Sequence, residues 1–185
     1  MTRWERNTEL LKLYEKKDNG RYRYIGRWLT LDYGQSVKPY LRLFWLQLLL
    51  MLAINVAMLV TPAGPMISYR VESFNYVMLL FGVEFLCSVA CIYYTWKVLG
   101  AKLWLPEHDS KYPDWHSAFS FITALAALGL LIAQLIYLLS AGHPDDRAWD
   151  ILLAVLALLN AVVNGLSWYF QRGMKWTMLP NDAKK

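Results

Sequence analysis

Glu84 is the residue of this sequence whose type and position most directly suggest chemistry. It is the single charged residue in an apolar run from Phe74 to Trp96, and it lies near the middle of that run. If the run crosses a bilayer, an ionised carboxylate there costs about 3 kcal/mol. Glu84 is therefore expected either to carry a proton or to face a partner inside the protein. An intramembrane acid of this kind is a candidate site for protons or polar solutes.

Other polar residues recur at helical spacing around Glu84 and on the other apolar runs. Cys87, Ser88 and Cys91 follow Glu84 at i+3, i+4 and i+7, a spacing that places all four on one face of a helix. Asn and Gln side chains that bond across helices in a membrane contribute about 0.6 to 2 kcal/mol each. We therefore predict an intramembrane polar seam made of Asn55, Glu84, Cys87, Ser88, Cys91, Gln134, Asn160, Asn164 and Ser167.

Three interpretations of this polar seam remain open. In the first, the seam only holds the helices together, and a neutral Glu84 donates a hydrogen bond to an amide. In the second, Glu84 is the centre of a proton- or solute-linked site. In the third, Glu84 faces another membrane subunit. The substitution Glu84→Gln separates them, because it should preserve assembly and abolish only a proton-linked activity.

The two cysteines invite a redox interpretation, which their position disfavours. Cys87 and Cys91 lie one helical turn apart in the middle of an apolar run, where a disulfide between them would be strained. Redox pairs are typically C-x-x-C at a helix start, where the thiol is activated. We expect buried, unreactive thiols.

The connection 103–116 holds the densest cluster of titratable residues, namely Glu107, His108, Asp109, Asp114 and His116. One hypothesis is an acid–base or metal site, with His108 and His116 as weak candidate ligands. The other is a proline-punctuated loop that Trp104 and Trp115 anchor at the membrane interface. The second is favoured because the chain has no H-E-x-x-H, nucleophile elbow or P-loop. We expect no enzyme, no metal and no cofactor.

A stretch before the first apolar run alternates basic and aromatic residues. Its candidate contact residues are Arg21, Arg23, Arg27 and Trp28. Basic residues near a membrane pair with anionic headgroups at about 1 kcal/mol each, and aromatic rings settle at the interface. The alternative is a docking surface for a protein partner. Nucleic acid is not expected, since basic residues belong beside a span without any such ligand.

Four apolar runs must position these residues. Of 185 residues, 57% are hydrophobic and 18% are charged, which excludes a disordered chain; two cysteines cannot form a disulfide scaffold. The runs are about 43–60, 74–96, 118–139 and 149–170, and each has the length of a bilayer-spanning helix. The predicted fold is an all-α integral membrane protein with an antiparallel four-helix transmembrane bundle.

The distribution of basic residues orients the bundle. Of the nineteen Lys and Arg, ten precede residue 43, three lie within 97–117 and four follow residue 170, while the other two connections have one each. The positive-inside rule then places both termini in the cytoplasm. We divide the chain into a cytoplasmic segment 1–42, with a short helix over 8–17 and an interfacial stretch, the bundle 43–170, and a basic tail 171–185. This pattern suits a multi-pass protein of a bacterial cytoplasmic membrane.

These features favour an accessory or interaction subunit of a larger membrane assembly, which docks through its cytoplasmic face. Its expected partners are anionic lipid headgroups and another membrane or cytoplasmic protein, or a second copy of itself. One alternative is a small oligomeric transporter or channel that uses Glu84 with Asn55, Asn160 and Asn164. A second alternative is a membrane enzyme that uses the loop 103–116; it requires the loop side chains to converge in one pocket.

Overall fold

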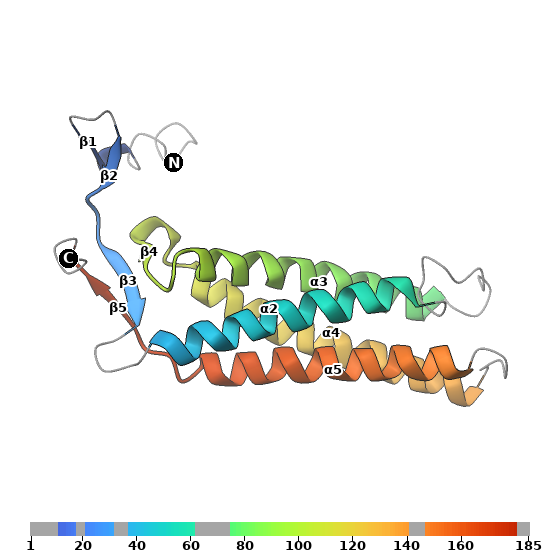
Figure 1. Cartoon of the computed structure of the whole chain (residues 1–185). Coiled ribbons are helices and arrows are strands. Elements are labelled where there is room, and N and C mark those ends of the chain that lie inside the picture. The colour runs from blue at the N-terminus through green and yellow to red at the C-terminus, as the bar shows by residue number, and fades with distance from the viewer. Residues whose placement is uncertain (1–10, 18–20, 32–36, 62–74, 141–146, 181–185) are drawn as a thin grey trace.

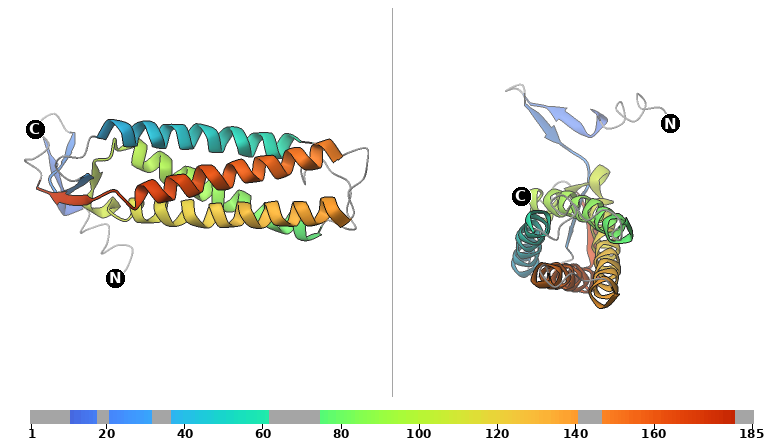
Figure 2. Two further views of the ribbon diagram at one scale, coloured as in Figure 1. Left: turned by 90° about the horizontal axis from the view of Figure 1, so that it is seen from below. Right: turned by 90° about the vertical axis from the view of Figure 1, so that its right-hand side faces the viewer.

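The computed structural model describes residues 11–17, 21–31, 37–61, 75–140 and 147–180. Its main body is a bundle of four long helices: α2 (Val37–Val60), α3 (Asn75–Gly100), α4 (Tyr112–Ser140) and α5 (Arg147–Gln171). Consecutive helices run in opposite directions (Figure 1), and an end-on view shows them at the corners of a square (Figure 2). All four are long and apolar enough to cross a membrane.

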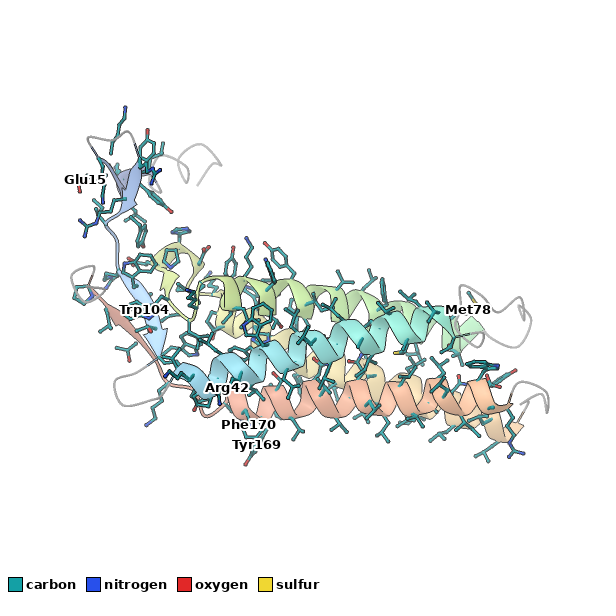
Figure 3. The ribbon with its side chains drawn as sticks, viewed as in Figure 1. Glu15, Arg42, Met78, Trp104, Tyr169 and Phe170 are labelled. Atoms are coloured by element: carbon teal, nitrogen blue, oxygen red, sulfur yellow. The ribbon has the colours of Figure 1, made fainter. Side chains whose placement is uncertain are left out.

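The bundle has polar side chains inside and large apolar side chains outside. Glu84 and Asn164 are both fully buried, whereas Leu86 on the same helix as Glu84 is 69% exposed. All four helices have exposed Leu, Ile or Val residues on their outer faces. Soluble monomers rarely expose contiguous apolar patches larger than a few hundred Å². Tyr169 and Phe170 point away from the bundle near one end (Figure 3), where aromatic residues settle at a membrane interface. The outer surface is therefore compatible with a membrane protein.

Three of the helices extend well beyond the apolar runs that predicted them. α2 begins at Val37, α3 continues to Gly100 and α4 begins at Tyr112. An apolar run marks the depth of hydrocarbon a helix can cross, not the residue at which the helix ends. Pro39 and Pro113 lie in the first turns of α2 and α4, where a missing N–H costs no hydrogen bond.

Outside the bundle, the described structure contains two small antiparallel sheets and the short 3-10 helix η1 (Glu107–Asp109). β1 (Tyr14–Lys16) pairs with β2 (Tyr22–Tyr24) in a hairpin, and β3 (Trp28–Leu31) lies between β4 (Leu105–Pro106) and β5 (Trp176–Leu179). The chain is thus mostly helical rather than all-α. The short helix predicted over 8–17 is wrong at 14–16, and residues 8–10 lie outside the described residues.

The three-stranded sheet covers one end of the bundle, which we call the cap end. Leu29 and Leu31 of β3, with Leu105 of β4, pack there against Phe44 and Val98 of the helices. The far end of the bundle has its own apolar core, to which all four helices contribute. Its members include Ile54, Met58, Val77, Phe81, Leu130 and Leu153.

A tight reversal after α3 brings β4 beside β3. Lys102 and Leu103 have positive φ angles of 50° and 63°, a conformation that non-glycine residues adopt at a cost of about 1 kcal/mol or more. The Leu103 side chain is fully buried in the cap-end core, and this burial offsets the strain. The reversal therefore joins the bundle to its cap.

Candidate functional site

Gln47 is the hub of a polar network inside the bundle. It comes from α2 and is 2% exposed. Its Oε1 accepts a hydrogen bond from Ser167 Oγ of α5 at 2.6 Å and faces His116 Nε2 of α4 at 3.1 Å. Its Nε2 donates to Ser120 Oγ at 3.2 Å and to Asn164 Oδ1 at 3.3 Å. One amide therefore connects three helices, and both of its polar atoms are satisfied.

The neighbours of His116 determine which ring nitrogen carries the proton. Nε2 lies 2.9 Å from Thr95 Oγ1 and 3.1 Å from Gln47 Oε1. The Thr95 hydroxyl already donates to the carbonyl of Cys91 at 2.7 Å, so its oxygen is left to accept. An amide oxygen also only accepts. We therefore assign the proton of the neutral ring to Nε2, and Nδ1 keeps its lone pair.

From the hub, a line of amides leads to Glu84. Asn164 Nδ2 donates to Asn160 Oδ1 at 2.9 Å, and Asn160 Nδ2 donates both to Glu84 Oε1 and to Ser88 Oγ, the latter at 3.2 Å. In the three successive bonds from Gln47 to Asn164, Asn160 and Glu84, the donor is always the residue nearer to Gln47. The line ends on the carboxyl group of Glu84.

Glu84 is fully buried, and its partners are neutral. Ser88 Oγ donates to Oε1 at 2.9 Å, in addition to the bond from Asn160. Within the described part of the chain, no Lys, Arg or His pairs with this carboxyl, and Oε2 has no hydrogen-bond partner. Amide and hydroxyl groups hold the carboxyl in place, but they do not supply a compensating charge.

The residues of the predicted seam do not form one network. Glu84, Ser88, Cys91, Asn160, Asn164 and Ser167 belong to the network around Gln47. Gln134 lies apart and donates to the Asp150 side chain at 3.3 Å. Asn55 Nδ2 donates to the main-chain carbonyl of Met51 at 2.8 Å, and its Oδ1 has no partner among the described residues. The side chain of Asn55 therefore makes no direct bond to Glu84.

The thiols are free. Cys91 is fully buried, and its Sγ lies 3.4 Å from Ser120 Oγ and 3.6 Å from Asn164 Oδ1. Cys87 is half-buried. Cys91 thus packs beside the hub as a small polarizable group.

A second polar cluster lies at the cap end, outside the four long helices. Arg27 Nη2 contacts Glu107 Oε1 at 2.6 Å, and its Nε donates to Oε2 at 3.3 Å. The guanidinium group lowers the pKa of Glu107, chiefly through these hydrogen bonds. The Tyr24 hydroxyl donates to the Arg27 carbonyl at 3.0 Å and accepts from the Glu107 N–H at 2.9 Å. This cluster fastens the β1–β2 hairpin to the turn that begins at Glu107.

The hairpin changes the expected roles of the basic-aromatic residues. Arg27 is committed to Glu107, and Trp28 packs against Tyr24 with ring centroids 4.9 Å apart. Arg23 is exposed on β2. Arg21, which directly precedes β2, is exposed as well, but it also has an interaction within the fold. Arg23 is therefore the predicted contact residue that the described fold leaves most open to an outside contact.

The titratable residues of 103–116 do not converge. His108 lies 3.7 Å from Asp109 at the surface, whereas His116 is inside the bundle on α4. Placing His116 in a loop was therefore wrong. Within the described ranges, no three His, Cys, Asp or Glu side chains gather as a metal site would require.

Five network members were absent from the predicted seam: Gln47, Thr95, His116, Ser120 and Gln171. The spacing of polar residues along α4 could have indicated two of them, His116 and Ser120. His116, Ser120 and Thr123 recur at i, i+4 and i+7, so they share one face of α4. That face is the one the helix presents to the bundle interior.

Comparison with known proteins gives no match to a protein-family model, a curated protein or a solved structure.

Proposed function

We propose that this chain is a small proton-linked membrane protein of the transporter type, in which Glu84 binds and releases the proton. The observation that carries the proposal is a fully buried carboxyl whose two partners, Ser88 and Asn160, are neutral. A glutamine at this position would accept the same two hydrogen bonds and would bring no charge into the bundle. What a carboxyl adds is an exchangeable proton, and an intramembrane acid is otherwise costly to keep.

The interior of the bundle favours proton exchange from the cap end. Polar side chains continue from Glu84 through Asn160 and Gln47 to His116 near that end. Toward the far end, Phe81, Leu130 and Leu153 fill the space between the helices. The amides between Glu84 and His116 donate and accept hydrogen bonds but have no titratable proton. Proton exchange at Glu84 therefore needs either water that enters the bundle or a movement of the helices. Passage of the proton to the far end needs either an opening of the apolar core or the assembly of several copies.

Proteoliposomes with a pH-sensitive dye inside test this proposal. An imposed pH gradient should collapse faster with the wild-type protein than with Glu84→Gln. Glu15→Gln is the matched control, because Glu15 is an exposed carboxyl on the hairpin, and it should behave like wild type. Wild-type vesicles that are no leakier than Glu84→Gln vesicles, at equal incorporation, would contradict proton-linked transport.

A second candidate function is that of an accessory subunit that docks through the hairpin. The hairpin projects sideways from the cap end, on the side of α3 (Figures 1 and 2). Tyr22 on β2 is 66% exposed, and Tyr24 fixes the hairpin to Glu107. Neither apolar core of the bundle includes a described hairpin residue. An ordered element that lies outside both apolar cores and projects from the cap end on the side of α3 supports a role in contacting a neighbour.

Native extraction in mild detergent distinguishes this second function. Tyr22→Glu should shift the protein from a large particle to a smaller one, because a charge replaces the exposed ring. Lys111→Glu is the control, since Lys111 is exposed near the same end of the bundle. A particle of unchanged size in Tyr22→Glu would exclude docking through the hairpin and would leave the role of Glu84 untouched.

A further inference from the structure

A cavity of about 130 Å³ lies at the cap end of the bundle, beneath the sheet. Its wall combines residues of all four long helices with the first residue of β5. The lining residues used below are Phe44, Asp114, His116, Gln171 and Trp176. The cavity is partly open to the outside. A molecule from the side of the membrane on which the sheet lies can therefore reach it.

Two nearly buried side chains on this wall have acceptor atoms that the described residues do not use. His116 is 1% exposed; its Nε2 is occupied by Thr95 and Gln47, which leaves the Nδ1 lone pair free. Gln171 is 8% exposed, and its Nε2 donates to Ser120 Oγ and Ser167 Oγ at 3.3 and 2.9 Å. Its Oε1 receives no donor from the described residues. Acceptor atoms of cavity-lining residues that receive no donor from the described residues are suited to a ligand that donates.

The electrostatics of the wall favour a cation. Among the described residues that line the cavity, Asp114 is the one charged residue, and none is Lys or Arg. The carboxylate of Asp114 is exposed at the rim. Two aromatic residues complete the wall, Phe44 and Trp176, and Phe44 packs on the His116 ring at 4.8 Å between centroids. Aromatic faces attract organic cations, and a carboxylate accepts charge-assisted hydrogen bonds from them.

The size of the cavity limits the ligand. An apolar cavity of about 150 Å³ is known to hold a molecule as large as benzene. The cavity beneath the sheet is slightly smaller, which suits a cation with only a few non-hydrogen atoms. A guanidinium or a short primary ammonium presents several N–H donors within that volume.

We propose that the cavity beneath the sheet binds a small organic cation of the guanidinium or primary ammonium class. His116 Nδ1, Gln171 Oε1 and the Asp114 carboxylate accept its N–H groups, and Phe44 and Trp176 enclose its apolar part. This site is separate from Glu84 and does not depend on the proton-linked role proposed for it.

Calorimetric titration of the purified full chain with methylguanidinium tests the proposal. Wild type should give saturable binding. Asp114→Asn should weaken it at least about tenfold, as expected for the loss of a charge-assisted bond. Gln171→Met, which keeps the side-chain length but removes the acceptor, should weaken it as well. Glu15→Gln, which changes an exposed carboxyl on the hairpin, should bind as wild type does.

Tetramethylammonium is the matched control ligand, because it has the same charge but no N–H donor. It should bind at least about tenfold more weakly than methylguanidinium. Absence of saturable methylguanidinium binding would overturn the proposal, and so would equal binding by Asp114→Asn. Equal binding of the two cations would also overturn it, since the His116 and Gln171 acceptors would then play no part.

Discussion

The hydrogen bonds between Glu84 and Asn160 can be measured through a double-mutant cycle. Asn160→Leu keeps the branched shape and the number of non-hydrogen side-chain atoms but removes the bonds to Glu84 Oε1 and Ser88 Oγ. Asn164 keeps a partner, because its Nδ2 also donates to the main-chain carbonyl of residue 160 at 3.0 Å. At about 0.6 to 2 kcal/mol for each bond between helices, the substitution should cost about 1 to 4 kcal/mol.

The double variant separates a specific bond from general disruption. Glu84→Leu alone leaves the Asn160 amide with one fewer acceptor, and Asn160→Leu alone leaves the Glu84 carboxyl with Ser88 as its remaining donor. When both residues are replaced, neither the carboxyl nor the amide is left in the bundle without its partner. The combined cost should therefore be smaller than the sum of the two single costs by about 1 kcal/mol or more.

Unfolding in mixed detergent micelles, followed by the loss of helical circular dichroism, provides the free energies. Leu159→Ala is the control on the same helix, because Leu159 faces outward and is 46% exposed; it should change the free energy of unfolding little. Single costs that add to within about 0.5 kcal/mol would refute a direct Glu84–Asn160 interaction. An Asn160→Leu variant as stable as wild type would refute it too.

Three further predictions concern the cap end and the second polar pair. Gly26→Ala should loosen the hairpin, because a Cβ there would overlap the Tyr24 phenol; protease cleavage within residues 21–24 should accelerate while the bundle keeps its thermal stability. Because Arg27 lowers the pKa of Glu107, their attraction is present at neutral pH and is lost as the pH falls through that lowered value; a spin label on the hairpin should then become more mobile, and Glu107→Gln should be mobile at every pH. Gln134→Leu, which removes a donor to the buried aspartate at the start of α5, should lower the free energy of unfolding by about 1 kcal/mol.

The sequence predicted the helices well because a single property determines them. A run of about 20 apolar residues is long enough to cross hydrocarbon and is helical there, so all four helices could be located. Spacing along one helix also grouped Glu84 with Ser88, and Asn160 with Asn164. The structure places these four side chains in direct contact.

What the sequence could not predict depends on contacts between distant residues. Trp28 on β3 pairs with both Pro106 and Leu179, and no local pattern in strands this short indicates those partners. His116 was assigned to a loop because the apolar run that predicts α4 begins at residue 118, although the helix itself begins at Tyr112. The hub role of Gln47 likewise arises only when α2, α4 and α5 come together.

Infrared difference spectroscopy of the protein in lipid, between acidic and alkaline buffer, tests directly whether Glu84 binds and releases a proton. A carboxyl that binds and releases a proton should give a reversible band of the protonated acid in wild type, and this band should be missing in Glu84→Gln. Glu15→Gln should retain it. If wild type and Glu84→Gln give the same difference spectrum, Glu84 does not exchange its proton, and the polar network only holds the helices together.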